Sequence, residues 1–241
     1  MKIELSLKLF YFFILINFSH AAIIITEVAD PNGDVGLRYV EIYNSGNSSV
    51  SLTDYYLIRF TNDNSNATSN IDLSSYTLAS KSFLIIAVNS TTFNSTFNVG
   101  SNTTVVDAPT GGPADSNGDD NIAIVTEASG QSFAHGSSST WDYVDIFGNP
   151  GTDGSGNWHE FEDGRAERVA SQTTGLTSST SSAWNCFSDS DTYLAGTSSG
   201  SASAISLSTA YSSNGFDPGA WDGHKLVTIS GNAGFRMLSA P

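Results

Sequence analysis

Short runs of apolar and β-branched residues recur along this chain, and clusters of Gly, Asn, Asp and Ser separate them. Runs with such punctuation are typical of strands. Beyond the N-terminal segment, no stretch has the apolar spacing of an amphipathic helix, so the crossover helices of a parallel α/β fold are missing. The pattern predicts an all-β domain, either a β-sandwich or a barrel. The predicted strands are Ile23–Val28, Arg38–Tyr43, Leu57–Phe60, Phe83–Val88, Val105–Val106, Asn121–Val125, Tyr143–Phe147, Arg165–Val169 and Lys225–Ile229.

Two of these strands carry a finer prediction. The run Arg38–Tyr43 alternates, which places its two aliphatic residues on one face and Tyr39, Glu41 and Tyr43 on the other. The run Phe83–Val88 is apolar throughout. We therefore expect it to be a central strand that is buried on both faces.

The N-terminal segment 1–21 has the pattern of a secretory signal peptide. Lys2 and Lys8 give it a weakly positive start, and the apolar stretch 9–16 is too short to span a bilayer. Small residues at its end place the cleavage after Ala21. The alternative is a buried first strand.

The rest of the chain divides by composition into two parts. Residues 22–170 contain most of the predicted strands and should form the sandwich. Residues 171–241 form a long extension that is rich in Ser, Thr and Gly over its first half. We expect this extension to pack on the sandwich as long loops, or to follow it as a flexible linker.

The charge balance excludes one class of function. The chain has a formal net charge of −15 and a pI near 4.2, whereas a nucleic-acid-binding protein needs clustered Lys and Arg.

After residue 21, no segment has the 18 uninterrupted apolar residues that suggest a transmembrane helix, so we expect a soluble, secreted protein. The single Cys186 either is buried as a small apolar side chain beside Trp184 and Phe187 or pairs between two chains.

Acceptor sequences for N-glycosylation are present in the first half of the chain. Their number is what chance predicts for a chain this rich in Asn, Ser and Thr, and they matter only if the protein is made in a eukaryotic secretory pathway. The candidate acceptors are Asn47, Asn66, Asn89, Asn94 and Asn102.

Several motifs, in order, carry a family resemblance. An apolar strand that ends in Thr-Glu is followed by a Val-Glu-Ile-Tyr-Asn strand, a spaced apolar run, an apolar strand, a Gly-Asp-Asp strand entry and an Asp-x-Phe-Gly strand end. These motifs lie at Ile23–Val28, Arg38–Asn44, Val50–Leu57, Ser82–Val88, Gly118–Ile124 and Asp145–Gly148. A further glycine-rich extension follows at Gly151, Asp153, Gly154, Gly156, Trp158, Asp163, Gly164, Ala166 and Arg168.

This order resembles the lamin tail domain family, in its secreted microbial and algal form. The resemblance covers roughly residues 22–187, and a Phe-Asp-Pro-x-x-Trp element at 216–221 extends it. It implies an immunoglobulin-like β-sandwich that tethers or adheres, often beside extracellular hydrolases. The nuclear role of lamins does not carry over, because this chain has a predicted signal peptide and no coiled-coil rod.

One loop is a candidate calcium site. Asp115, Asn117 and Asp119 offer oxygen ligands at alternate positions, as the start of an EF-hand loop does. The glutamate at the twelfth position of such a loop is missing, since Thr126 stands there, and no flanking helices are predicted. The alternative is that the Asn-Gly and Gly-Asp pairs simply form turns.

The tryptophans lie in polar, Gly- and Ser-rich surroundings. Trp141 and Trp158 are candidates for stacking on sugar rings if their indoles are exposed. The alternative, which also covers Trp184 and Trp221, is that each indole closes an end of the sandwich, because large aromatic side chains dominate burial.

The densest group of charged residues is the segment His159–Asp163. Alternation in a strand would place Glu160 and Glu162 on one face, where they would serve acid–base chemistry or form a solvated surface near Arg165 and Arg168. No Gly-x-Ser-x-Gly motif and no paired histidines accompany it. We therefore predict no catalytic residues.

Together these patterns predict a secreted, non-catalytic module that binds or anchors to an extracellular protein or glycan. Two alternatives stay open. One is a secreted hydrolase, or the accessory domain of one, whose site the sequence does not reveal. The other is a calcium-dependent extracellular structural protein. The oligomeric state is left open by the sequence.

Overall fold

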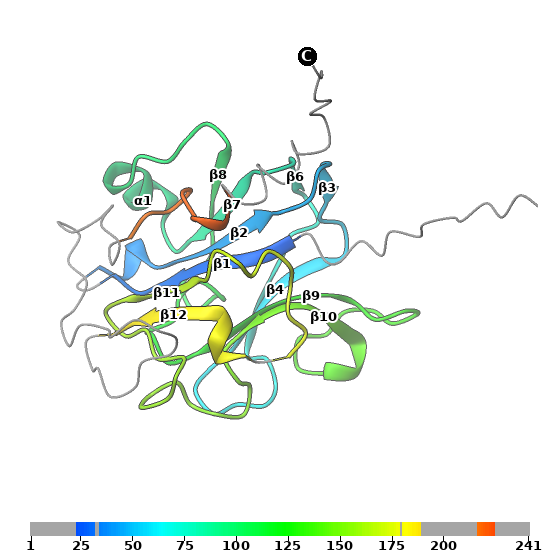
Figure 1. Cartoon of the computed structure of the whole chain (residues 1–241). Coiled ribbons are helices and arrows are strands. Elements are labelled where there is room, and N and C mark those ends of the chain that lie inside the picture. The colour runs from blue at the N-terminus through cyan, green and yellow to red at the C-terminus, as the bar shows by residue number, and fades with distance from the viewer. Residues whose placement is uncertain (1–22, 32–33, 179, 189–215, 225–241) are drawn as a thin grey trace, which may run out of the picture.

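The apolar runs of the sequence form two β-sheets that pack against each other, as Figure 1 shows. The structure is a computed structural model, and it describes residues 23–31, 34–178, 180–188 and 216–224. The predicted signal peptide and the predicted strand Lys225–Ile229 lie outside these residues. Among the described residues no helix is long and apolar enough to cross a membrane.

The larger sheet has six strands in the order β12-β11-β1-β2-β7-β8, and the smaller has four in the order β10-β9-β4-β5. The six-stranded sheet is built from β1 (Ile23–Ala29), β2 (Tyr39–Asn44), β7 (Phe83–Ala87), β8 (Thr103–Asp107), β11 (Arg165–Arg168) and β12 (Trp184–Phe187). The four-stranded sheet is built from β4 (Tyr55–Phe60), β5 (Ser69–Asp72), β9 (Asn121–Glu127) and β10 (Trp141–Phe147), and a small pair is formed by β3 (Val50–Ser51) and β6 (Thr77–Leu78).

The prediction of an all-β sandwich is confirmed. Apolar side chains from both sheets meet in one core, among them Ile42 of β2, Leu57 of β4 and Ile124 of β9. The alternation of β2 is also confirmed, because Val40 and Ile42 lie in this core while the tyrosines of β2 pack on the opposite, outer face of the six-stranded sheet. The strand β7 is buried along its whole length between β2 and β8, as its uninterrupted apolar run predicts.

A short helix joins the two strands that pair in parallel. The helix α1 (Ser90–Thr96) follows β7 and supplies the crossover to β8, whose pairing with β7 is parallel. The side chain of Asn89 caps the helix by accepting a hydrogen bond from the Thr92 N–H, at 3.0 Å. The helix spans only seven residues, so it has no periodic pattern long enough to be predicted.

Part of the chain after residue 170 belongs to the sandwich. The strand β12 completes one edge of the six-stranded sheet by pairing with β11. The segment Phe216–His224 lies on the outer face of the same sheet, where Phe216 and Trp221 are buried.

Cys186 of β12 is buried in the core and has a free thiol. Burial raises the pKa of this thiol well above its ordinary value.

A buried ion pair joins the two sheets. Arg168 of β11 and Asp145 of β10 form a salt bridge, and both side chains are fully buried. Asp145 also accepts hydrogen bonds from the N–H groups of Ile25, at 2.7 Å, and Leu176, at 2.8 Å. Arg168 donates to the Ile25 carbonyl and lies over the Trp184 ring. These contacts provide hydrogen-bond partners for the N–H and carbonyl groups of Ile25, beside the bulge that interrupts the pairing of β1 with β2.

Candidate functional site

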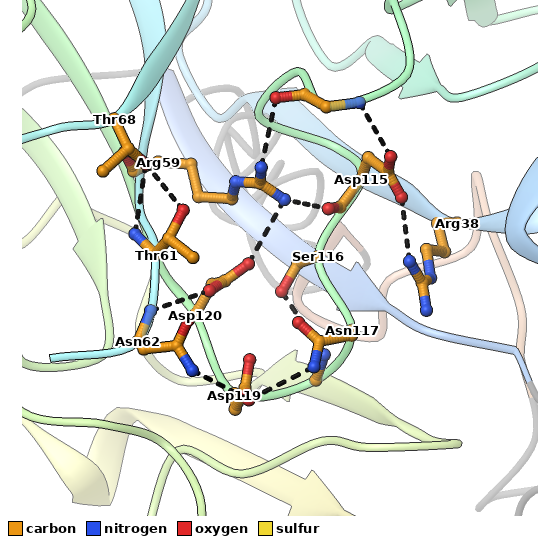
Figure 2. Close-up of polar contacts among 12 residues, drawn as sticks. Arg38, Arg59, Thr61, Asn62, Thr68, Asp115, Ser116, Asn117, Asp119 and Asp120 are labelled. Atoms are coloured by element: carbon orange, nitrogen blue, oxygen red, sulfur yellow. Dashed lines mark hydrogen bonds and ion pairs between the residues drawn. The ribbon is translucent and has the colours of Figure 1, made fainter. Parts of the chain in front are cut away.

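The loop that carries the predicted calcium ligands lies between β8 and β9, and Figure 2 shows its contacts. Asp115 accepts hydrogen bonds from Arg38, at 2.8 Å, and from the Gly111 N–H, at 2.7 Å. Partial burial alone would raise the pKa of Asp115, but these two donors outweigh it and hold that pKa below its ordinary value. Arg38 also pairs with Asp30 at 2.7 Å. Asp115 therefore serves as one end of an ion-pair chain.

The two aspartates at the end of this loop have different partners. Asp120 is fully buried, accepts from the Asn62 N–H at 2.9 Å and lies 3.3 Å from a guanidinium nitrogen of Arg59. Asp119 accepts from the side-chain amides of Asn117, at 3.2 Å, and Asn62, at 3.5 Å. Burial and the nearby Asp120 carboxylate raise the pKa of Asp119 above its ordinary value.

The predicted calcium ligands do not converge on one point. In Figure 2, the Asp115 carboxylate points toward Arg38 and away from Asp119. Asn117 presents its amide nitrogen, not its oxygen, to Asp119. Over the described part of the chain, no group of three or more His, Cys, Asp or Glu side chains is arranged to hold a metal ion. Calcium binding at Asp115, Asn117 and Asp119 stays a prediction from the sequence.

The loop packs against the glycine-rich segment that precedes β11. The Gly118 carbonyl accepts from the Phe161 N–H at 2.7 Å, and the Asp119 carbonyl accepts from the Gly154 N–H at 2.8 Å. Gly118 has a φ of +96°, and a Cβ atom there would lie 2.2 Å from the Glu162 Cα. Gly118 and Gly154 thus occupy places where two backbones approach too closely for a side chain.

The interpretation of His159–Asp163 as a strand with a solvated face is wrong. The segment has turn and irregular structure, and His159, Glu160 and Phe161 are buried. Glu160 accepts from the Gly156 N–H at 2.7 Å, and a ring nitrogen of His159 lies 3.3 Å from the Thr152 carbonyl oxygen. The local glycines turn the chain inward, so these polar side chains hold the turns of segment 151–164 together.

Three of the four tryptophans are buried. Trp184 lies in the core, Trp221 on the outer face of the six-stranded sheet, and Trp141 on the outer face of the four-stranded sheet with 5% of its surface exposed. Trp158 is half-buried and packs edge-on against Phe147 and His159. In this structure neither Trp141 nor Trp158 presents a fully open ring.

The outer face of the four-stranded sheet nevertheless carries a group of partly exposed aromatic rings. Tyr56 of β4, Tyr143 of β10 and Phe133 of the β9–β10 loop pack over the buried residues of this face. The rings of Tyr56 and Phe133 are stacked, with centroids 3.7 Å apart and planes within 4°. The buried Trp141 packs edge-on against Tyr143, with ring centroids 5.0 Å apart. We call Tyr56, Phe133 and Tyr143 the aromatic face.

A carboxylate fixes the geometry of the aromatic face. Glu127 accepts hydrogen bonds from the Tyr56 hydroxyl and from the Phe133 N–H, both at 3.2 Å. Burial and Glu127 raise the pKa of Tyr56 to about 12, so its hydroxyl stays a hydrogen-bond donor well into the alkaline range. Glu127 thus holds the loop that carries Phe133 against β4. The sequence analysis missed this face, because only Trp141 was singled out from it.

The five candidate glycosylation sites all lie at exposed positions. Asn89 and Asn94 are at the start and within α1, and Asn102 precedes β8. Asn47 lies between β2 and β3, and Asn66 lies between β4 and β5. Nothing in the fold excludes a glycan at any of them.

The chain matches no known protein-family model, and no curated protein matches it. The resemblance to lamin tail domains therefore rests on the motifs alone and stays a prediction. The structure does explain several motif positions physically, because Asp145 and Arg168 form the buried ion pair and Gly118 allows the close backbone approach.

Proposed function

We propose that this protein is a secreted, non-catalytic module that anchors to an extracellular glycan through the aromatic face. The observation that carries the proposal is the gathering of Tyr56, Phe133 and Tyr143, partly exposed, on one side of the four-stranded sheet. Aromatic side chains with one apolar and one solvated side are enriched at binding surfaces. Among the described residues, the exposed large apolar side chain is Val35, whereas the rings of the aromatic face are partly exposed.

The chemistry of the aromatic face suits a sugar. The flat C–H face of a pyranose ring packs on an aromatic ring, and carboxylates beside it accept hydrogen bonds from sugar hydroxyls. Glu127 lies beside the rings, where its carboxylate accepts a hydrogen bond from the Tyr56 hydroxyl. The rings rest on strands and on a hydrogen-bonded loop, so little side-chain freedom is lost on binding.

The non-catalytic part of the proposal is supported by the roles of the charged groups. In the segment His159–Asp163, His159 and Glu160 have backbone partners within their own turns. Asp115, Asp120 and Asp145 are engaged with arginines. The secreted location rests on the predicted signal peptide, and the anchoring role agrees with what the lamin tail resemblance implies.

Changing Phe133 to Ala is expected to weaken glycan binding by about 5- to 150-fold, because a central aromatic contact is worth about 1–3 kcal/mol. Binding of the purified full chain would be screened against immobilised glycans and then measured by calorimetry. The matched control is Val35→Ala, which removes an exposed apolar side chain on η1 (Val35–Leu37). The proposal fails if no glycan is bound, or if Phe133→Ala binds as tightly as the unchanged chain. Capture of a protein partner alone would also contradict the glycan assignment.

A further inference from the structure

Three glutamates form a row across the outer face of the six-stranded sheet. Glu27 of β1 lies directly opposite Glu167 of β11 on one side and Glu41 of β2 on the other. Glu27 and Glu41 are 2% and 1% exposed, and Glu167 is partly exposed. Like charges directly opposite each other destabilise an antiparallel pair, and burial increases the effect. We call these three residues the carboxyl row.

The segment Phe216–His224, which we call the strap, covers this row. Figure 1 draws it in red on the six-stranded sheet. At one end, Phe216 packs in a cluster with Tyr39 and Phe187. At the other end, Trp221 packs on Tyr43 and donates a hydrogen bond from its indole nitrogen to the Arg168 carbonyl, at 2.7 Å. The two aromatic anchors thus lie on either side of the row.

Polar contacts join the strap to the row between these anchors. The Gly219 N–H donates to one carboxyl oxygen of Glu41 at 2.5 Å, and the Thr26 hydroxyl donates to the other at 2.6 Å. Asp217 of the strap pairs with Arg165 of β11. The same guanidinium lies 3.0 Å from Glu27 and 3.1 Å from Glu167.

Over the described residues, the charges around the carboxyl row do not balance. The carboxyl row and Asp217 together offer four carboxyl groups, and the cation that faces them among the described residues is Arg165. The other titratable groups that act on the row are Tyr39 of β2, which is buried, and Asp222 of the strap, which adds further negative charge. Unbalanced charge in a largely buried cluster is unfavourable, so docking of the strap favours proton binding by some of these carboxyl groups.

The pKa values agree with this need for protons. Burial raises the pKa of Glu41 to about 8 and, despite Arg165, raises that of Glu167 to about 7. Burial also raises the pKa of Glu27 well above its ordinary value. When the strap is not docked, the carboxyl row would be exposed to water, and each glutamate would ionise near its ordinary pKa.

We propose that the strap is a proton-dependent closure, held on the six-stranded sheet while the carboxyl row is partly protonated and released when the row ionises. Raised pKa values mean that the docked state binds protons more tightly than the released state. Docking is therefore complete at acid pH and is lost as the pH rises through about 7 to 8. Release uncovers the apolar surface under the strap, including Ile24, Tyr43 and Phe83.

The test is a pH titration of the full chain labelled with 5-fluorotryptophan and followed by fluorine NMR. The Trp221 resonance is assigned by its loss in Trp221→Phe, and Trp184 in the core serves as an internal reference. Between about pH 5 and pH 9, Trp221 should move to a solvent-exposed position while Trp184 stays unchanged. A Trp221 resonance that does not move, or that moves only together with Trp184, would overturn the proposal.

Two variants assign the transition to the row. Glu41→Gln removes one ionisation and keeps an oxygen for the Gly219 N–H, so the midpoint should rise by about one pH unit or more. Glu167→Gln changes a partly exposed residue, so this variant should fold even if Glu41→Gln does not. It should remove the part of the Trp221 transition that lies near pH 7. Asp142→Asn, at an exposed position on β10, should titrate as the unchanged chain does. Titration of both glutamine variants like the unchanged chain would contradict the proposal.

Discussion

Replacing Asp145 with alanine is expected to lower the free energy of unfolding by about 3–5 kcal/mol, because it leaves the buried Arg168 guanidinium without its counter-ion. The same change removes the acceptor for the Ile25 and Leu176 N–H groups. Unpaired buried donors add to the cost. Since the ion pair joins β10 of one sheet to β11 of the other, its loss should loosen the contact between the sheets.

Urea unfolding, followed by far-UV circular dichroism, measures this effect as a lower midpoint at an unchanged slope. Asp142→Ala is the matched control on the same strand, because Asp142 is exposed, and it should change stability by no more than about 0.5 kcal/mol. The double variant Asp145→Leu with Arg168→Met should recover part of the loss, since apolar residues can replace a buried ion pair. Equal stability of Asp145→Ala and Asp142→Ala would show that the pair does not hold the sheets together.

Changing Gly118 to Ala is expected to cost about 2–5 kcal/mol from two separate causes. An L residue at a φ of +96° is strained by about 1–2 kcal/mol, and crowding against neighbouring backbone adds about 1–3 kcal/mol. The crowding arises because a Cβ atom would lie 2.2 Å from the Glu162 Cα. The loop and the segment 151–164 would have to move apart, which would disturb the contacts of Asp119 and Asp120.

Gly130 offers a control that separates the two causes. Its φ of +76° also lies in the left-handed region, but nothing lies within 4 Å of a Cβ atom built there. Gly130→Ala should therefore show only the conformational cost of about 1–2 kcal/mol. Thermal unfolding of both variants gives the comparison. If Gly118→Ala were no less stable than Gly130→Ala, the close packing of the loop against Glu162 would be refuted.

The sequence predicts the strands that have a local apolar or alternating pattern. The apolar runs of β7 and β9 and the alternation of β2 are local features, and each lies where it was expected. The strands β5 and β12 were missed for a physical reason. Ser69–Asp72 is polar, and Trp184–Phe187 lies in a Ser/Thr-rich stretch, so each becomes a strand only through pairing with a partner elsewhere in the chain.

The surroundings of the charged residues could not be predicted in the same way. Alternation placed Glu41 on the same face as Tyr39 and Tyr43, but its burial depends on a contact with Gly219, 178 residues away. Asp115 looked like a metal ligand because its partner Arg38 is 77 residues distant in the sequence. A side chain's burial and its ion-pair partner are set by tertiary contacts, which residue spacing does not encode.

The aromatic face also depends on tertiary contacts that residue spacing does not encode. Trp141 was recognised as a candidate for stacking, yet it is buried beneath the face, and its neighbours are the partly exposed rings. Phe133 stands in a Gly- and Ser-rich loop with no local pattern around it. Its position follows from the hydrogen bond to Glu127 and the stacking on Tyr56, which only the folded chain brings together.

The most direct test of the proposed function is to locate the bound ligand on the protein. A glycan identified by screening would be titrated into the isotope-labelled full chain, and the backbone amide shifts would be followed by NMR. The proposal predicts that the largest shifts cluster at Tyr56, Phe133 and Tyr143 and saturate with the affinity measured by calorimetry. Shifts centred on the loop 115–120 or on the segment 151–164, with the aromatic face unchanged, would contradict it.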